Sequence, residues 1–91
     1  MNNGTFNVSG YSKLVIGAGS EDAGLSGNAI SVADEGALYD STVKGGEIHG
    51  VNAMSFAGNN LMTDVTITVD GTLGNTGSLT LAGNSSVVFK Q

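Results

Sequence analysis

The chain has 91 residues with 15 Gly, no Pro and no Cys, and its eight acidic against three basic residues give a net charge of −5. This negative charge repels phosphate backbones, so nucleic acid is excluded as a partner. The absence of Cys excludes disulfides and thiolate metal sites, and no apolar run is long enough for direct membrane insertion.

Short β-strands are the secondary structure that the sequence predicts, because apolar and polar residues alternate over short runs between turns rich in Gly, Asn and Asp. In chain order, we expect strands over residues 6–8, 13–16, 30–32, 38–43, 47–51 and 65–69, with a last one through 87–89. The stretch from 17 to 27 is expected to be mostly loop. Gly36, Gly45 and Gly71 mark turns between strands.

A repeat runs through these elements. Four units share two apolar residues spaced two apart, followed about six residues later by a second apolar patch. The paired residues are Phe6/Val8, Ile30/Val32, Met54/Phe56 and Leu79/Leu81. The offset, which is the difference between the numbers of equivalent residues, is 24 from Phe6 to Ile30 and from Ile30 to Met54, and 25 from Met54 to Leu79. A fixed period in this range is typical of repeat architectures.

A period of about 24 residues is too short for a four-stranded propeller blade, and it lacks the helix of leucine-rich or ankyrin repeats. It suits one coil of a β-solenoid whose successive coils pair in parallel about 4.8 Å apart. The sequence therefore predicts an all-β chain, a single domain over residues 1–91 with about 3.5 coils of roughly 24 residues each. The last unit is half a coil, so we expect the chain to be part of a longer surface protein.

Parallel stacking at this offset has specific consequences for side chains. Phe6, Ile30, Met54 and Leu79 are expected to form one file inside the tube. Asparagine ladders are expected where Asn28 lies over Asn52 and Asn59 over Asn84, since stacked amides hydrogen-bond along the axis.

Residues 37–51 resemble the repeats of the AIDA-type autotransporter adhesins. The repeats of that family read small residue, Asn or Asp, Ser or Thr, Thr, Val, two spacers including Gly, Gly, then Val. The residues in those positions here are Asp40-Ser41-Thr42-Val43, Gly45-Gly46 and Val51. The family repeat is about 19 residues long, which is shorter than the period predicted for this chain.

The resemblance implies a right-handed parallel β-helix, secreted or held at the surface of Gram-negative bacteria, that acts in adhesion, autoaggregation or biofilm formation without enzymatic activity. Its partners are then surface glycans or proteins of host or bacterium, or a second copy, and no cofactor or metal is expected. In some members a glycosyltransferase adds heptose to Ser or Thr, and Ser41 and Thr42 match those positions as candidates for O-glycosylation. Tyr11 and Tyr39 are the side chains that we expect to contact a partner.

A polysaccharide-binding or polysaccharide-degrading β-helix, similar to a phage tailspike or a lyase, is the alternative. Asp40 and Asp64 occupy equivalent positions at the offset of 24, and stacking would place their carboxylates about 5 Å apart, a spacing that suits a retaining glycosidase. Equivalent positions offer like environments, however, whereas catalysis needs two different pKa values. Turn capping is therefore favoured for both residues, and a shared Ca²⁺ ion is a further alternative.

His49 is the single histidine of the chain. The offset of 24 aligns it with Leu25 and Leu73, which favours a partly packed ring in an apolar column over a metal ligand or a general base. No Cys or second His is present to complete a zinc site.

Overall fold

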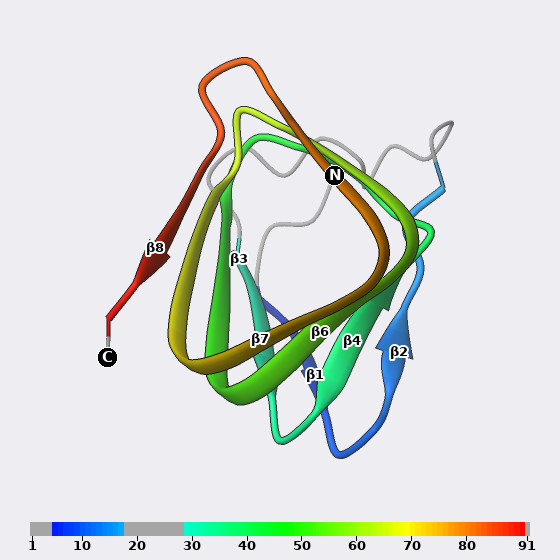
Figure 1. Ribbon diagram of the computed structural model, residues 1–91, viewed down its shortest axis with the longest axis vertical. Helices are drawn as coiled ribbons and strands as arrows, with labels where there is room; N and C mark the ends of the chain where they lie inside the picture. The colour runs from blue at the N-terminus through cyan, green and yellow to red at the C-terminus, as the bar shows by residue number, and fades with distance from the viewer. Residues whose placement is uncertain (1–4, 18–28, 91) are drawn as a thin grey trace.

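The computed structural model describes residues 5–17 and 29–90, and it is a right-handed parallel β-helix. Seen along its axis, the chain runs counterclockwise while it advances toward the viewer (Figure 1). The predicted all-β parallel solenoid is thus confirmed. Its strands are β1 (Thr5–Ser9), β2 (Lys13–Leu14), β3 (Ala29–Ala33), β4 (Gly36–Tyr39), β5 (Thr42–Lys44), β6 (Glu47–Thr63), β7 (Thr66–Ala82) and β8 (Ser86–Phe89).

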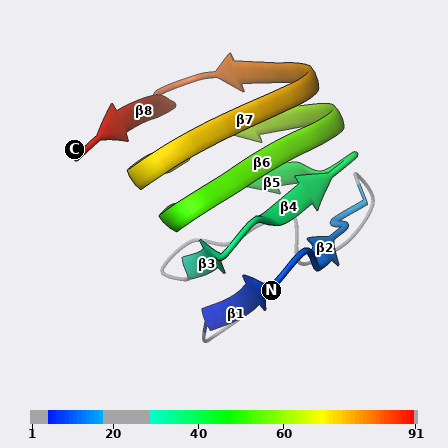
Figure 2. The ribbon, with the colours of Figure 1, turned by 60° about the horizontal axis from the view of Figure 1, so that its bottom comes forward.

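The coil has three sides, which Figure 1 shows as a triangle and Figure 2 shows as stacked turns. The first side holds β1, β3, β8 and the opening residues of β6 and β7. The second side holds β2, β4 and the middle of β6 and β7, and the third holds β5 and the last residues of both long strands. β6 and β7 have 17 residues each and bend around two corners without losing their parallel pairing.

The coil length differs from the predicted one. Phe6 pairs with Ile30 at the expected offset of 24, but Ile30 then pairs with Ile48 at an offset of only 18. The next offsets are 19, to Ile67, and 20, to Val87. The predicted file of Phe6, Ile30, Met54 and Leu79 is therefore wrong beyond its second member, because Met54 pairs with Gly36 and Leu73 on the second side, and Leu79 pairs with Asn60.

The error has a geometric reason. Each side of the triangle presents an inward-facing apolar pair, so similar pairs recur within a coil as well as between coils. From Ile30 the chain returns to the same side at Ile48, an offset of 18, and it reaches the next side at Met54, an offset of 24. From Ile30 to Met54, the offset of 24 is thus one coil plus one side, whereas from Phe6 to Ile30 it is one coil.

The interior of the tube is filled by side chains from all three sides. Ile48, Phe56 and Met62 are buried on β6, one on each side, and each lies in register with an apolar residue of the coil before it, namely Ile30, Leu38 and Val43. Burying an aliphatic or aromatic side chain of this size is worth about 1.5–3 kcal/mol. The alternating inward residues therefore supply most of the stabilisation, as in other stacked repeats.

Two buried polar residues, Ser41 and Asn60, tie three coils together inside the corner between the second and third sides. The Ser41 hydroxyl accepts a hydrogen bond from the Ile16 backbone N–H at 3.0 Å. The Ser41 backbone N–H donates to Asn60 Oδ1 at 3.0 Å, and Asn60 Nδ2 donates to the Ala57 carbonyl at 2.9 Å. Because buried polar groups are costly when unpaired, this network fixes the corner geometry.

Two aspartates on the outer surface each accept a hydrogen bond from a backbone N–H of the next coil, and we call each of these contacts an aspartate clip. Asp40 Oδ1 accepts the Asn59 backbone N–H at 2.8 Å, and Asp64 Oδ1 accepts the Asn84 backbone N–H at 2.9 Å. Both aspartates have left-handed φ values, 49° for Asp40 and 56° for Asp64. Each carboxylate also lies so close to a glycine of the next coil that a Cβ there would clash, and these glycines are Gly58 and Gly83.

The asparagine ladders take a different form from the predicted one. Asn59 accepts a hydrogen bond from the Ser78 hydroxyl at 2.9 Å and does not lie over Asn84, which is clipped to Asp64. Asn52 Nδ2 donates to Asp34 Oδ1 at 3.0 Å, while Asn28 lies outside the described residues, as does most of the predicted loop.

Replacement of Asp64 by Ala is expected to destabilise the fold by about 1–3 kcal/mol, because it removes an acceptor for a corner N–H and places Ala in the left-handed region. Asp64→Asn keeps a side-chain oxygen and tolerates that φ, so its unfolding midpoint should stay close to the wild-type value. Urea unfolding followed by circular dichroism measures both. Equal stability of the Ala and Asn variants would disprove the clip.

Candidate functional site

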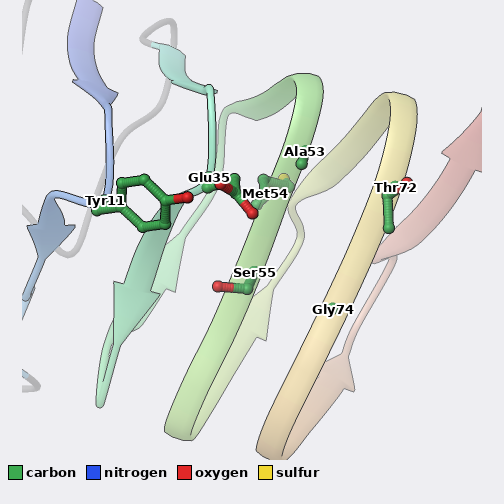
Figure 3. Close-up of a pocket in the computed structure, with 7 residues that line it drawn as sticks. All are labelled: Tyr11, Glu35, Ala53, Met54, Ser55, Thr72 and Gly74. Carbon is green, nitrogen blue, oxygen red and sulfur yellow. The ribbon is translucent and has the colours of Figure 1, made fainter.

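The outer surface of the second side is hollowed at its corner with the first side. A groove of about 310 Å³ lies there, and we call it the Tyr11 groove. Figure 3 shows its lining residues, which come from successive coils: Tyr11, Glu35, Ala53, Met54, Ser55, Thr72 and Gly74. The hollow arises because Ser55 and Gly74, paired in register at outward positions of β6 and β7, are both small.

Tyr11 forms one wall of the groove and is the most exposed large hydrophobic side chain among the described residues, at 78%. It follows Gly10 in a tight turn, where both residues have left-handed φ values of 64° and 66°. The Gly10 backbone N–H donates to the Asp34 carbonyl at 3.1 Å, which anchors the turn on the next coil. The turn therefore holds an aromatic ring outside the packed tube.

Glu35 faces this ring across the corner (Figure 3). Its backbone N–H donates to the Ala53 carbonyl at 2.7 Å, and its side chain lies beside the Tyr11 hydroxyl (Figure 3). Hydrogen bonding to Glu35, followed by the negative charge of that side chain, raises the pKa of Tyr11 above its ordinary value of 10.0. The corner thus combines an exposed aromatic face with a carboxylate that accepts hydrogen bonds.

Tyr39 does not line the Tyr11 groove. It ends β4, at the other edge of the second side, and is 37% exposed. The Lys13 ammonium lies 4.8 Å from the centroid of its ring, a cation–π contact worth about 0.5–1 kcal/mol at an exposed site. The two tyrosines expected to contact a partner are therefore separate features of the second side.

The two candidate O-glycosylation residues have different environments. Ser41 is fully buried, and its hydroxyl also lies 3.2 Å from the Leu14 carbonyl and 3.1 Å from the Tyr39 carbonyl, so the packed corner has no room for a sugar on this oxygen. Thr42 begins β5 at an outward position and is half-buried. Of the pair, only Thr42 keeps a surface position in the folded chain.

Asp40 and Asp64 do not form the predicted carboxylate pair. Asp40 lies at the corner between the second and third sides, and Asp64 lies at the corner between the third side and the first. Each carboxylate binds a different backbone N–H of the coil above it. The predicted pair was wrong because it rested on the offset of 24, whereas the coils that contain these residues repeat at offsets of 18 to 20.

His49 lies on the outside of the first side, and its predicted packing with Leu73 is wrong for the same reason, while Leu25, the other predicted neighbour, lies outside the described residues. The true partner at an offset of 19 is Thr68. The His49 side chain is 48% exposed, and its Nε2 atom lies 2.8 Å from Asp70 Oδ2. These residues, with Glu47 and Lys90, line a second open groove of about 440 Å³. An exposed pair of this kind contributes little to stability.

Several of the residues that line these two grooves were not predicted from the sequence. Glu35 lies at an offset of 24 from Tyr11, so the offset between the first two coils was sufficient to place them side by side. Thr72 and Gly74 require the shorter offsets of the later coils, as does the pairing of His49 with Thr68. The signal that reveals these shorter offsets is the recurrence of Ile48 as Ile67, at an offset of 19.

Removal of the Glu35 charge is expected to lower the pKa of Tyr11 toward 10.0, because the carboxylate favours the protonated phenol. The hydrogen bond between the two side chains should therefore persist through neutral pH and be lost only when the pH rises above the raised pKa. In a Tyr39→Phe background Tyr11 is the only tyrosine left, so tyrosinate absorbance reports it alone.

The titration midpoint should fall when Glu35→Gln is added to this background, whereas Glu47→Gln on the first side serves as the matched control and should leave it unchanged. An identical midpoint with and without the Glu35 charge would contradict the described pairing.

No protein family model, curated protein or solved structure matches this chain. Within residues 5–17 and 29–90, no helix is long and apolar enough to cross a membrane. The same residues contain no group of three or more His, Cys, Asp or Glu side chains arranged to hold a metal ion. The candidate surfaces are therefore defined by their own geometry.

Proposed function

We propose that this chain is a structural and adhesive module of a bacterial surface autotransporter passenger, acting in adhesion, autoaggregation or biofilm formation. The observation that carries the proposal is the coil length. Successive coils from Ile30 onward repeat at offsets of 18, 19 and 20, which agrees with the repeat of about 19 residues in the AIDA-type adhesins. From Ile30 onward, the coil length therefore agrees with the family repeat, whereas the first coil, from Phe6 to Ile30, keeps an offset of 24.

The residues that carry the resemblance also have structural roles that a repeat unit must supply. Asp40 clips a corner, Val43 is buried inside the third side, and Gly45 and Gly46 adopt left-handed φ values of 74° and 90° at the next corner. A corner hydrogen bond, an inward apolar residue and a left-handed turn are elements that each coil of a longer β-helix needs, and a repeat with this pattern supplies all three.

The placement of functional groups also supports an adhesive role. The interior of the described coils is packed with apolar side chains, whereas Tyr11, Tyr39 and the polar groups that surround them face outward. A rod of this kind presents contact residues along its length. Its proposed partners are glycans or proteins on host or bacterial surfaces, or a second copy of the chain, and Thr42 is the proposed acceptor if a glycosyltransferase modifies it.

The alternative of a polysaccharide-degrading enzyme rested on a carboxylate pair formed by Asp40 and Asp64. Those residues lie at different corners and bind different backbone N–H groups. No observation on the described residues favours the enzyme over the adhesive module, so the adhesive module is the function proposed.

Beads coated with the chain are expected to bind Gram-negative bacteria or epithelial cells, or to aggregate with one another, several-fold more than beads coated with an unrelated acidic protein. The matched variant is Tyr11→Ala combined with Tyr39→Ala, which removes the two exposed tyrosine rings and keeps the buried core. Its circular dichroism should match that of the wild type while bead binding falls. Wild-type beads that neither aggregate nor bind any cell would overturn the proposal.

A further inference from the structure

We propose that the Tyr11 groove is a binding site for a neutral saccharide, in which a sugar ring stacks on Tyr11 and donates hydroxyl hydrogen bonds to Glu35. This inference rests on the adhesive function proposed for the chain and names the ligand of one of its surfaces. It is carried by the chemistry of the residues that Figure 3 places around the groove.

The aromatic wall supplies an apolar surface of the right kind. Tyr11 is 78% exposed, and a left-handed turn fixes its backbone, so the ring is presented to solvent without a packing role in the tube. The face of an aromatic ring carries partial negative charge, and it attracts the weakly positive C–H groups that line one face of a pyranose. Because the turn already holds the backbone of Tyr11, binding of a ligand to the ring does not have to order this segment of the chain.

The polar wall supplies hydrogen-bond acceptors for hydroxyl groups. An ionised carboxylate offers about four lone-pair sites, and the hydrogen bond between Glu35 and Tyr11 uses one of them. The remaining sites accept hydrogen bonds from ligand hydroxyls, and bonds to a charged acceptor are stronger than neutral ones. Ser55 and Thr72 add hydroxyl groups that both donate and accept.

The charge of the groove selects against acidic sugars. Glu35 is the charged residue in the lining, and Asp34 precedes it at the same corner. Uronic and sialic acids would bring a third carboxylate into this region, in a chain whose net charge is −5. A cationic peptide would be attracted by charge, but the hydroxyl-bearing and apolar remainder of the lining matches a polyol better than an ammonium group.

The floor of the groove sets its size and provides a steric probe. The volume of about 310 Å³ lies at the lower end of the range for small-molecule sites, which suits one or two sugar rings. A Cβ added to Gly74 would lie 3.5 Å from the Ser55 Cβ, which is ordinary van der Waals contact. Gly74→Ala should therefore fold normally while it partly fills the floor.

The test is a titration of the 91-residue chain, labelled with ¹⁵N, followed by two-dimensional NMR. The ligands are neutral disaccharides of glucose, galactose and N-acetylglucosamine, a uronate-containing disaccharide and a lysine tripeptide. We expect saturable shifts of the Glu35, Ser55 and Gly74 amides with at least one neutral disaccharide, with a Kd on the order of 1 mM for a single stacked ring. The uronate disaccharide should bind at least ten-fold more weakly.

Substitutions inside and outside the Tyr11 groove test whether the saccharide binds there. Tyr11→Ala should weaken the affinity at least ten-fold, and Glu35→Gln and Gly74→Ala should each weaken it several-fold. Tyr39→Ala removes an exposed ring outside the groove and should leave the affinity unchanged. Circular dichroism and urea unfolding of each variant establish that the fold is retained.

Failure of this inference is separable from failure of the adhesive function. If coated beads bind cells but neutral saccharides neither shift the groove amides nor inhibit the beads, the saccharide site is disproved and the adhesive module stands. Preferential binding of the lysine tripeptide in the groove would also overturn the inference, in favour of a cationic partner. Beads that bind no cell and do not aggregate disprove the adhesive function, whatever the titration shows.

Discussion

The hydrogen-bonded stacking of each coil on the one before it is the constraint on which the rest of this structure depends. Parallel pairing fixes which residues lie above one another, so the offset between Ile30, Ile48 and Ile67 determines the contents of every inward column. A shift of one residue would turn the inward apolar side chains outward, because side chains alternate along a strand. The register is therefore held by the burial of one face throughout the coil.

The corners are where alternation is interrupted, and specific polar residues hold them in place. Asp40 has a left-handed φ value, and after it the alternation restarts with Ser41 facing inward and Thr42 facing outward. The buried hydroxyl of Ser41 accepts a hydrogen bond from the backbone N–H of Ile16 in the neighbouring coil. The same corner thus contains a surface clip and an internal hydrogen-bond network, and both act between coils.

The sequence was sufficient to predict strands, parallel stacking and a β-helix, because apolar alternation and Gly-rich turns are local signals. The coil length was not predicted, since inward apolar pairs recur on every side and an offset of one coil plus one side produces the same pattern. The error affected each residue whose neighbour was inferred from it, including Asp40, Asp64 and His49. Ser41 was misplaced for a different reason, because a family motif does not tell which of its hydroxyls faces inward.

For the candidate site, the sequence was sufficient to predict Tyr11 as an exposed aromatic side chain but not to assemble the groove around it. Glu35 lies beside Tyr11 because the offset between the first two coils is 24. Ser55, Thr72 and Gly74 lie at the same corner because the later coils have shorter offsets. The groove contains residues from four successive coils, so its composition depends on the strand register between each coil and the next. Such a site becomes visible only when each offset is known.

Engineered disulfides measure the register most directly, because the chain has no cysteine of its own. Ser31 and His49 are paired at an offset of 18 on the outer face of the first side, and neighbouring parallel strands place paired Cα atoms about 4.8 Å apart, within disulfide range. The double variant Ser31→Cys with His49→Cys should form an intramolecular disulfide on mild oxidation while keeping its native circular dichroism. The variant Ser31→Cys with Ser55→Cys, which matches a coil with an offset of 24, should not. Cross-linking of the second pair in place of the first would contradict the coil length and the surfaces built on it.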